Sequence, residues 1–321
     1  MNKPLRFVAA AAATTLLLAG CSDSAEPESD ATSGSPSAES GDFGSAADVA
    51  TLEQITWTED ESGVPTLEFE TPGSVSAAST RIVNEGEGDL IEAGDIIQVS
   101  YTIVDGSDGS ELYSTYSYEA PEYLNVEENL FDPELYNAFL AATPGSDIIY
   151  ASVGTTSTSE EESTVLMALT VDAVMADVPE SATGTEVEPT TEGLPTVTFG
   201  EGDPTISFEG ATESEELVAE TLIQGEGAPL EQGDVVAVNY TGWLWDGETF
   251  DSSWSRGYPA AFEFVEGMLI DGWIQGLEGV NIGSRVLLVI PSDLGYGDEG
   301  NSSIPGGSTL VFVVDLLDTM E

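Results

Sequence analysis

The side chains of this sequence that could do chemistry are aromatic rings interleaved with a few polar groups. The segment Asn239–Ser253 contains Tyr240, Phe250 and Asp251, and Arg256 follows the aspartate five residues later. Three more aromatic residues come downstream at Trp273, Tyr296 and Phe312. Residues of these types build an apolar pocket with a small number of polar anchors. The order of aromatic residue, carboxylate, tryptophan and tyrosine is therefore the most informative feature of the sequence.

The residue types that are absent narrow the chemistry further. The sequence contains no histidine, and its single cysteine is Cys21. Ser-His-Asp and Cys-His nucleophilic catalysis, a histidine-ligated metal and an internal disulfide are thereby excluded. Acid–base chemistry would have to come from carboxylates or tyrosine, whereas rotation about an amide bond needs no proton transfer. We expect neither a metal ion nor a cofactor.

Short strands are predicted to position these residues. The first two run over Val235–Leu244 and Thr249–Ser252, and Asp246-Gly247 between them is suited to a tight turn. Alternation of side chains places Tyr240 on the apolar face of the first strand. Further strands are expected over 262–264, 286–290 and 310–317, and one helix over 269–280. Antiparallel strands with a single helix covering one sheet face make an α+β domain.

This combination of motifs resembles the FKBP family of peptidyl-prolyl cis-trans isomerases from Ala219 to Met320. The resemblance is carried by the segment Asn239–Ser253, by Leu269-Ile270-Asp271-Gly272-Trp273, by Asp293-Leu294-Gly295-Tyr296-Gly297 and by Thr309-Leu310-Val311-Phe312. It implies a curved antiparallel half-barrel sheet wrapped around a short helix, with an apolar cleft between them. It also implies that macrolide inhibitors of the family are ligands of this cleft.

The resemblance assigns a role to each candidate residue. Trp273 would be the floor on which the prolyl ring rests, and Asp251 would be a carboxylate in the cleft. The hydroxyl of Tyr296 would bond the substrate carbonyl, and the backbone N–H of Ile270 would donate to the ligand. The remaining residues that would contact substrate are Tyr240, Phe250, Arg256, Leu269, Ile304 and Phe312.

Local sequence leaves alternatives open for three of these residues. Trp273 could be a plain core residue, and the glycines that flank Tyr296 are equally typical of an ordinary turn. Arg256 could contact substrate or hold Asp251 by an ion pair, and the ion pair is favoured.

One departure from the family's pattern concerns the wall of the cleft. The family usually has an aromatic residue directly after the proline at Pro259, and here Ala260 stands there. Tyr258 and Trp254 are the candidates to fill that gap. The departure affects expected substrate preference and macrolide affinity more than it affects the fold.

The chain also repeats itself. Gly63–Phe69 resembles Gly193–Phe199, and Glu92–Thr102 resembles Glu231–Thr241. Two copies of a self-contained FKBP-like domain are the natural interpretation. The predicted organisation is a lipoprotein signal peptide (1–20), a disordered tether (21–47), a first domain (48–176), a linker (177–192) and an isomerase domain (193–321).

The first copy is predicted to be degenerate and without isomerase activity. It has Tyr113 at the position of Asp251, and Phe139 is expected at the position of Trp273. No Gly-Tyr-Gly motif occurs in 153–163. The domain would be a spacer or a client-binding module. Asp105–Gly109 is interpreted as a polar hairpin turn in preference to a calcium loop, because the EF-hand spacing is absent.

The N-terminal residues resemble a bacterial lipoprotein signal. Lys3 and Arg6 precede the apolar run Phe7–Leu18, which is shorter than an ordinary membrane-spanning helix. Leu18-Ala19-Gly20-Cys21 resembles a lipobox, which implies cleavage before Cys21 and lipid attachment to its sulfur. The alternative is a secreted protein that is cleaved elsewhere. The expected location is the extracytoplasmic face of a membrane.

Composition limits the choice of partners. Sixty acidic residues face five basic ones, and the formal net charge is −55. Such a surface repels phosphate backbones, so nucleic acid is not an expected partner. Solubility is the favoured explanation of this acidity over a specific cation-binding role.

The function expected from the sequence is prolyl isomerisation by an anchored protein that assists the folding of exported or surface proteins. Its partners would be proline-containing exported polypeptides and, through Cys21, the membrane. The main rival is a non-catalytic peptide-binding or chaperone lipoprotein that uses the same cleft. A solute-capturing lipoprotein of a transporter is a third reading, disfavoured because such receptors are usually large two-lobed α/β folds.

Overall fold

A computed structural model describes residues 41–60, 62–118, 120–155, 162–200 and 203–320. The chain divides into two compact units between Ala176 and Asp177. We call residues 41–176 the N-terminal unit and residues 177–320 the C-terminal unit. Residues 1–40, which contain the expected signal peptide, Cys21 and most of the expected tether, lie outside the described residues.

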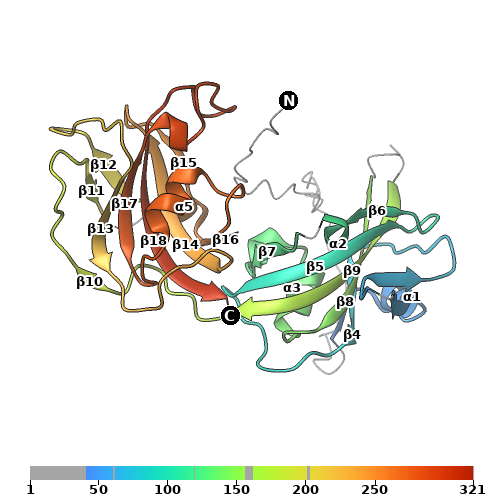
Figure 1. Cartoon of the computed structure of the whole chain (residues 1–321). Coiled ribbons are helices and arrows are strands. Elements are labelled where there is room, and N and C mark those ends of the chain that lie inside the picture. Colours follow the sequence, from blue (N-terminus) through green and yellow to red (C-terminus); the bar gives the residue numbers. More distant parts are fainter. Residues whose placement is uncertain (1–40, 61, 119, 156–161, 201–202, 321) are drawn as a thin grey trace, which may run out of the picture. The chain divides into compact units, whose positions relative to one another are not determined.

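The C-terminal unit is built on one antiparallel sheet (Figure 1). Its strands follow the order β10, β13, β17, β18, β14, β15, and β16 also pairs with β14. Their bounds are β10 Thr185–Glu186, β13 Val218–Gln224, β14 Val235–Leu244, β15 Thr249–Ser252, β16 Ala260–Glu263, β17 Arg285–Ile290 and β18 Leu310–Met320. The short helices are α4 Ser253–Arg256 and α5 Asp271–Leu277, with a 3-10 turn, η2, over Ser292–Leu294. The predicted α+β class is confirmed.

The hairpin of β14 and β15 has the predicted bounds. Gly247 in its turn has φ of +92°, a conformation that costs a residue without Cβ little. The register shifts between Gly242 and Trp243, so that Gly242 pairs with Asp251 while Trp243 pairs with Thr249. This irregularity bends the hairpin beside Asp251, whose carboxylate contacts Tyr240 of β14.

The helix α5 is shorter than the sequence predicts at both ends. It begins after Ile270, whose extended backbone forms the N-cap, and ends at Leu277. Gly279 has φ of +78°, and its N–H donates to the carbonyl of Leu230. The prediction of a helix up to Val280 was wrong because this glycine turns the chain toward the loop before β14.

The N-terminal unit has the same strand order as the C-terminal unit. Its sheet runs β1, β4, β8, β9, β5, β6, and β7 also pairs with β5. The bounds are β1 Asp42–Phe43, β4 Ser79–Asn84, β5 Ile96–Asp105, β6 Glu111–Ser114, β7 Glu122–Asn125, β8 Asp147–Thr155 and β9 Glu162–Met175. Its helices are α1 Ala46–Leu52, α2 Thr115–Tyr118 and α3 Pro133–Leu140, with a 3-10 turn, η1, over Glu128–Leu130. This equivalence of strand order supports the predicted repeat.

Each sheet is covered on both faces. One face packs on a helix, which is α3 in the N-terminal unit and α5 in the C-terminal unit, where α5 contacts β17 and β13. The opposite face of the C-terminal sheet is covered by the hairpin of β11 (Thr196–Thr198) and β12 (Thr205–Ser207). Its Val197 and Ile206 pack against a buried cluster of Leu287, Val289 and Val311. In the N-terminal unit, α1 and the hairpin of β2 (Thr56–Glu59) and β3 (Pro65–Glu68) take the corresponding place. Both outer faces are therefore buried instead of solvated.

The folded N-terminal unit begins earlier than expected. Phe43 in β1 pairs with Thr80 of β4 and packs against the core, and Ser45 caps α1 by accepting a hydrogen bond from the Asp48 N–H. The prediction of a tether up to Ala47 was therefore wrong for residues 42–47. Phe43 is the one large apolar residue between 22 and 47, and a single apolar residue produces no periodicity.

The segment 177–192 is attached to the C-terminal unit and is not the free linker that composition predicts. Asp315 of β18 is fully buried and pairs with Arg285 through two contacts of 2.5 and 2.6 Å. Its Oδ2 also accepts a hydrogen bond from the Ala182 N–H at 2.8 Å. A buried carboxylate has to be paired, so these contacts fix the segment to the sheet.

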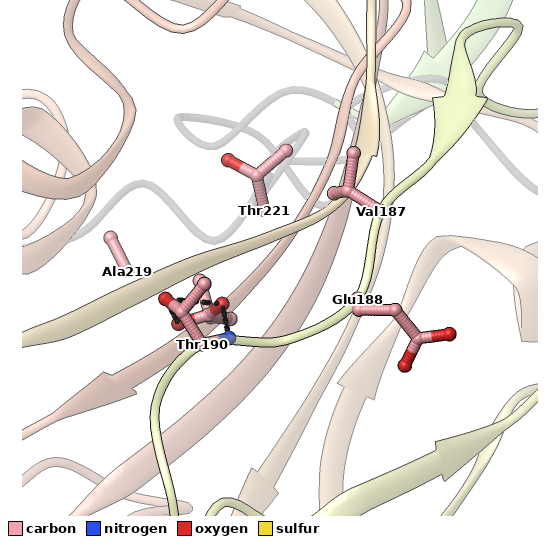
Figure 2. A pocket seen from close by; sticks show the side chains of 6 residues that line it. Val187, Glu188, Thr190, Ala219 and Thr221 are labelled. Atoms are coloured by element: carbon pink, nitrogen blue, oxygen red, sulfur yellow. Dashed lines mark hydrogen bonds between the residues drawn. The ribbon is translucent and has the colours of Figure 1, made fainter.

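Glu220 of β13 fixes the same segment at a second point. Its carboxylate is 6% exposed and accepts hydrogen bonds from the Thr190 N–H at 2.5 Å and from Thr191 Oγ1 at 2.6 Å. Figure 2 shows Thr190 turned toward β13, beside a hollow of about 290 Å³. Burial would raise the pKa of Glu220, but these donors bring the pKa below its ordinary value. No predicted site residue lines this hollow.

None of the helices in the described ranges is both long enough and apolar enough to cross a membrane.

Candidate active site

Trp273 lies at the centre of an aromatic cluster in the C-terminal unit. Three rings meet its indole nearly edge-on, with centroids 5.4 Å away for Tyr240, 5.4 Å for Phe312 and 5.8 Å for Phe262. Phe250 continues the cluster, 5.4 Å from Phe312. Edge-to-face contacts of this kind favour one fixed arrangement of the rings.

The indole of Trp273 is 4% exposed, and its Nε1–H has no hydrogen-bond partner in the described structure. Buried donors are usually paired, so an orphaned N–H is an exception that a bound acceptor would remove. The predicted aliphatic residues pack into the same core cluster. They are Leu269, Ile270 and Ile304.

Phe262 supplies the aromatic wall whose absence was inferred from Ala260. It lies two residues further along β16, pairs with Val236 of β14 and packs against Trp273. The suggestion that Tyr258 or Trp254 fills the gap was wrong for Trp254, whose ring packs on Phe199, the residue that follows β11. The signal was present in the alternation of Phe262-Glu263-Phe264, which places both phenylalanines on one strand face.

Asp251 is the centre of a polar cluster at the rim of the aromatic residues. Its Oδ2 accepts a short hydrogen bond from the Tyr240 hydroxyl, and its Oδ1 pairs with Arg256 Nη1 at 2.5 Å. Arg256 Nη2 donates to the Tyr240 hydroxyl at 3.1 Å, and the guanidinium lies 5.5 Å from the Tyr240 ring centroid. Burial, followed by the bond to Asp251, raises the pKa of Tyr240. Arg256 thus forms the ion pair that the sequence favoured.

Tyr296 packs against the same cluster from the loop that follows η2. Burial, with a smaller contribution from the charge of Asp251, raises the pKa of Tyr296 to about 12. Within the described part of the chain, nothing pairs with its hydroxyl, which is therefore available as a neutral donor at physiological pH. The Gly297 N–H donates to the Ser292 carbonyl and fixes this loop.

Two serines connect the rim of the cluster to the sheet. Ser253 Oγ accepts from the Tyr240 N–H at 2.9 Å and donates to Asn239 Oδ1 at 2.8 Å. Ser252 Oγ pairs with Thr241 Oγ1 at 2.8 Å and caps α4. These bonds hold the turn that places Arg256 over Asp251.

Asp203 is a positioning residue that sequence reasoning missed. It accepts hydrogen bonds from the hydroxyls of Ser252 and Ser255, at the two ends of the first turn of α4. Asp203 lies in the loop between β11 and β12, so it contacts α4 only because this hairpin covers the sheet. No local sequence pattern predicts this contact of Asp203 with α4.

The close approach of the aromatic walls requires Gly242 in β14. A Cβ on this residue would lie 2.5 Å from Phe250 Cζ and 2.8 Å from Phe312 Cε1. The N-terminal unit has Ile103 at the same register position, because Ile103 pairs with Tyr113 as Gly242 pairs with Asp251. The corresponding space in the N-terminal unit is therefore filled by a side chain.

The position of Trp273 is occupied in the N-terminal unit by Leu135, and the assignment of Phe139 was wrong. Both helices begin after an extended N-cap residue, and Trp273 and Leu135 are each the third helical residue. The N–H of Ala142 bonds the Phe139 carbonyl as the N–H of Val280 bonds that of Leu277. Phe139 therefore corresponds to Leu277.

In the described residues, no three side chains of types that ligate metals are grouped together. Asp105 and Gly109 belong to the turn between β5 and β6, and the Asp105 carboxylate accepts from the Ser107 N–H at 2.8 Å. This arrangement is a polar hairpin turn.

Comparison with known proteins places this cluster in a family. Residues 227–317 match the model of the FKBP-type peptidyl-prolyl cis-trans isomerases. An FK506-binding protein of Streptomyces anulatus is 39% identical over 117 residues, which are 36% of this chain and 94% of that protein. The FKBP-type peptidyl-prolyl cis-trans isomerase FkpA of Escherichia coli is 45% identical over 107 residues, 33% of this chain and 39% of that protein. The crystal structure of FkpA from Escherichia coli has 42% identity over 34% of this chain and 51% of that chain, with a TM-score of 0.32. The match thus spans nearly all of the Streptomyces protein and well under two thirds of the Escherichia coli one.

Proposed function

The chain belongs to the FKBP-type peptidyl-prolyl cis-trans isomerases, with its isomerase domain in residues 227–317, and we propose that this domain accelerates the rotation of X–Pro bonds in exported or surface proteins. The observation that carries the proposal is the cluster of Trp273, Tyr240, Phe262 and Phe312 with Asp251 at its rim. The same cleft is proposed to bind macrolides of the FK506 type, after which the Streptomyces relative is named.

The aromatic cluster would act by binding the twisted amide better than the planar one. Amide resonance sets a rotation barrier of about 18–20 kcal/mol, and the planar ground state is the more polar of the two. A pocket lined by Trp273 and the surrounding rings offers few partners for that polarity, so it disfavours the planar state relative to the transition state. Catalysis of this kind is differential binding and needs no covalent step.

The polar residues would hold the peptide in register during rotation. The Tyr296 hydroxyl would donate to a substrate carbonyl, and the Ile270 N–H would be the second donor, as in the family. Asp251 is occupied by Tyr240 and Arg256, so its role would be to fix the Tyr240 ring and to set the field at the rim. We assign Arg256 to this clamp in preference to direct substrate contact.

Export and anchoring rest on residues outside the described structure. The basic residues Lys3 and Arg6, the apolar run and the lipobox-like Cys21 support a lipid anchor on the extracytoplasmic face of a membrane. Incorporation of labelled palmitate into the wild-type protein but not into Cys21→Ser would establish it. Equal label in both proteins, or none in the wild type, would reject the anchor.

The rival hypothesis is a non-catalytic peptide-binding protein, and one of the two observations that favoured it has another explanation. It rested on the alanine at 260 and on the acidic surface, and Phe262 supplies the aromatic wall that the alanine lacks. Acidity alone does not argue against catalysis, because the residues around Trp273 are apolar.

The direct test is prolyl isomerisation of a proline-containing tetrapeptide and of a slowly refolding protein by the full-length chain. We expect acceleration that Trp273→Ala removes and that Asp251→Asn lowers. Folding of each variant is checked by its thermal unfolding transition. A folded wild-type protein without activity would refute the proposed function. A truncated version should begin at residue 177, because the segment 177–192 is part of the folded unit.

A further inference from the structure

In the N-terminal unit, tyrosines stand at the positions that Tyr240, Asp251 and Arg256 occupy in the C-terminal unit. Tyr113 holds the register position of Asp251 on the strand that follows the turn. Tyr118 is the last residue of α2, as Arg256 is the last residue of α4. The counterpart of Tyr240 remains a tyrosine. The three tyrosines, which we call the tyrosine shelf, are Tyr101, Tyr113 and Tyr118.

The rings of the tyrosine shelf are packed in series. The Tyr101 and Tyr113 centroids are 5.7 Å apart, and those of Tyr113 and Tyr118 are 5.6 Å apart with an interplanar angle of 24°. Tyr118, at the outer end, is 69% exposed. A large aromatic ring held by a stack and open to solvent presents a flat apolar surface to a ligand.

The side chains behind the tyrosine shelf are buried and differ from those of the aromatic cluster in the C-terminal unit. Ile103 fills the place of Gly242, Leu135 that of Trp273, and Met167 that of Phe312, with exposures of 5%, 2% and 9%. The N-terminal unit thus lacks the tryptophan proposed as the floor for a prolyl ring, and a side chain stands where Gly242 leaves room. A ligand of the N-terminal unit would therefore lie on the shelf, where its amide bonds are not enclosed.

The electrostatics around the shelf select for positive charge. Glu122 lies beside it, and its Oε1 accepts a hydrogen bond from the Tyr101 hydroxyl at 2.7 Å. Arg81 is the one basic residue in the sequence from 41 to 176, and its guanidinium donates to the carbonyls of Leu52 and Ile55. No cation of the N-terminal unit therefore opposes a basic ligand at this surface.

We propose that the tyrosine shelf is a second, non-catalytic site that binds extended, proline-containing basic segments of polypeptides. Proline rings lie flat on aromatic faces, and a polyproline II segment is already ordered before it binds. Lysine and arginine side chains in the same segment gain from the tyrosine faces and from Glu122. The site concerns binding only, so it does not depend on the isomerase activity of the other unit.

The test is the binding of a fluorescein-labelled peptide of alternating lysine and proline to the full-length chain, measured by anisotropy at two salt concentrations. Tyr118→Ala is expected to weaken binding about five- to tenfold, and Tyr118→Phe is expected to retain it because the ring remains. Glu122→Gln is expected to reduce the salt dependence. Leu90→Ala is the matched control, because Leu90 is 59% exposed in the same unit but lies outside the shelf.

Three results would overturn the proposal. One is the absence of measurable binding by the wild-type chain. Another is binding that Trp273→Ala abolishes and Tyr118→Ala leaves unchanged, which would place the peptide in the C-terminal cleft. The third is equally tight binding of a peptide of alternating glutamate and proline. Tyr118→Ala should leave the isomerisation rate of a tetrapeptide unchanged, which separates this site from the proposed enzyme.

Discussion

Replacing Gly242 by alanine should damage the cleft while leaving the sheet intact. The added carbon would lie 2.5 Å from Phe250 Cζ and 2.8 Å from Phe312 Cε1, whereas carbon atoms pack at about 3.5–4.0 Å. Both rings would therefore have to retreat by roughly 1 Å. A displacement of that size in residues that position substrate can lower kcat/KM by about 100-fold. Overpacking should also cost about 1–3 kcal/mol of folding stability.

The assay is kcat/KM for tetrapeptide isomerisation, with thermal unfolding followed in parallel. Gly200→Ala is the control, because no described atom lies within 4 Å of the carbon it would add. A second variant, Gly242→Ala with Phe250→Leu, tests the reasoning further. The N-terminal unit combines Ile103 with Leu112 at these positions, so the double variant should recover stability without recovering the rate.

Wild-type kcat/KM in a folded Gly242→Ala protein would refute the argument. It would mean that the two rings move without consequence, so that they are not walls of the substrate site. A loss of rate in the Gly200→Ala control would show that the assay responds to general destabilisation. The argument would then have to be tested at a temperature far below the unfolding transition.

Three further predictions follow from the polar groups of the C-terminal unit. Tyr296→Phe should lower kcat/KM about two- to tenfold, which is the effect of losing one neutral hydrogen bond. The wild-type rate should show no ionisation of Tyr296 between pH 6 and 9, because the pKa of this tyrosine is raised to about 12. A rate that falls through this group in that range would contradict its assignment as a neutral donor. Asp315→Ala should destabilise the C-terminal unit by about 3–5 kcal/mol, because it leaves the charge of Arg285 unpaired beside the sheet. Calorimetry measures this loss, and an unchanged unfolding temperature would contradict the prediction. The carboxyl of Glu220 has a lowered folded pKa, so its stabilisation is present above the ordinary value of 4.5 and is lost as pH falls toward the folded pKa. The difference in unfolding temperature between wild type and Glu220→Gln should therefore be larger at pH 7 than at pH 3, and an equal difference at both would disprove the linkage.

The local sequence was sufficient for the hairpin that carries Tyr240 and Asp251. The bounds of β14 and β15 were predicted because Asp246-Gly247 fixes the turn and alternation fixes the faces. The fold class followed from the strand and helix pattern together with the family resemblance. The residues proposed for the cleft were identified by the order of their motifs, and the structure brings them together around one core cluster.

Chain segments of low complexity were the least predictable part of the fold. Composition indicated a free linker at 177–192, yet two distant carboxylates fix the segment. Asp315 binds Ala182, which lies 133 residues earlier in the chain, and Glu220 binds Thr190, which lies 30 residues earlier. A hydrogen bond to a buried carboxylate leaves no periodic signal in the polar segment that donates it. The same reason explains why Asp203 was missed.

An isomerase domain of the FKBP type was recognisable in the amino-acid sequence, because the order of its motifs resembles that family and motif order is visible without the folded structure. The folded chain was needed to identify the ring that completes the wall and the residue that replaces Trp273 in the N-terminal unit. Phe262 takes the place of the aromatic residue expected at position 260, because the pairing of β16 with β14 sets which residues face Trp273. Leu135 faces the core because the residue at which α3 begins determines which of its side chains point inward. Register and helix phase depend on pairing between distant segments, and that pairing is a property of the folded chain.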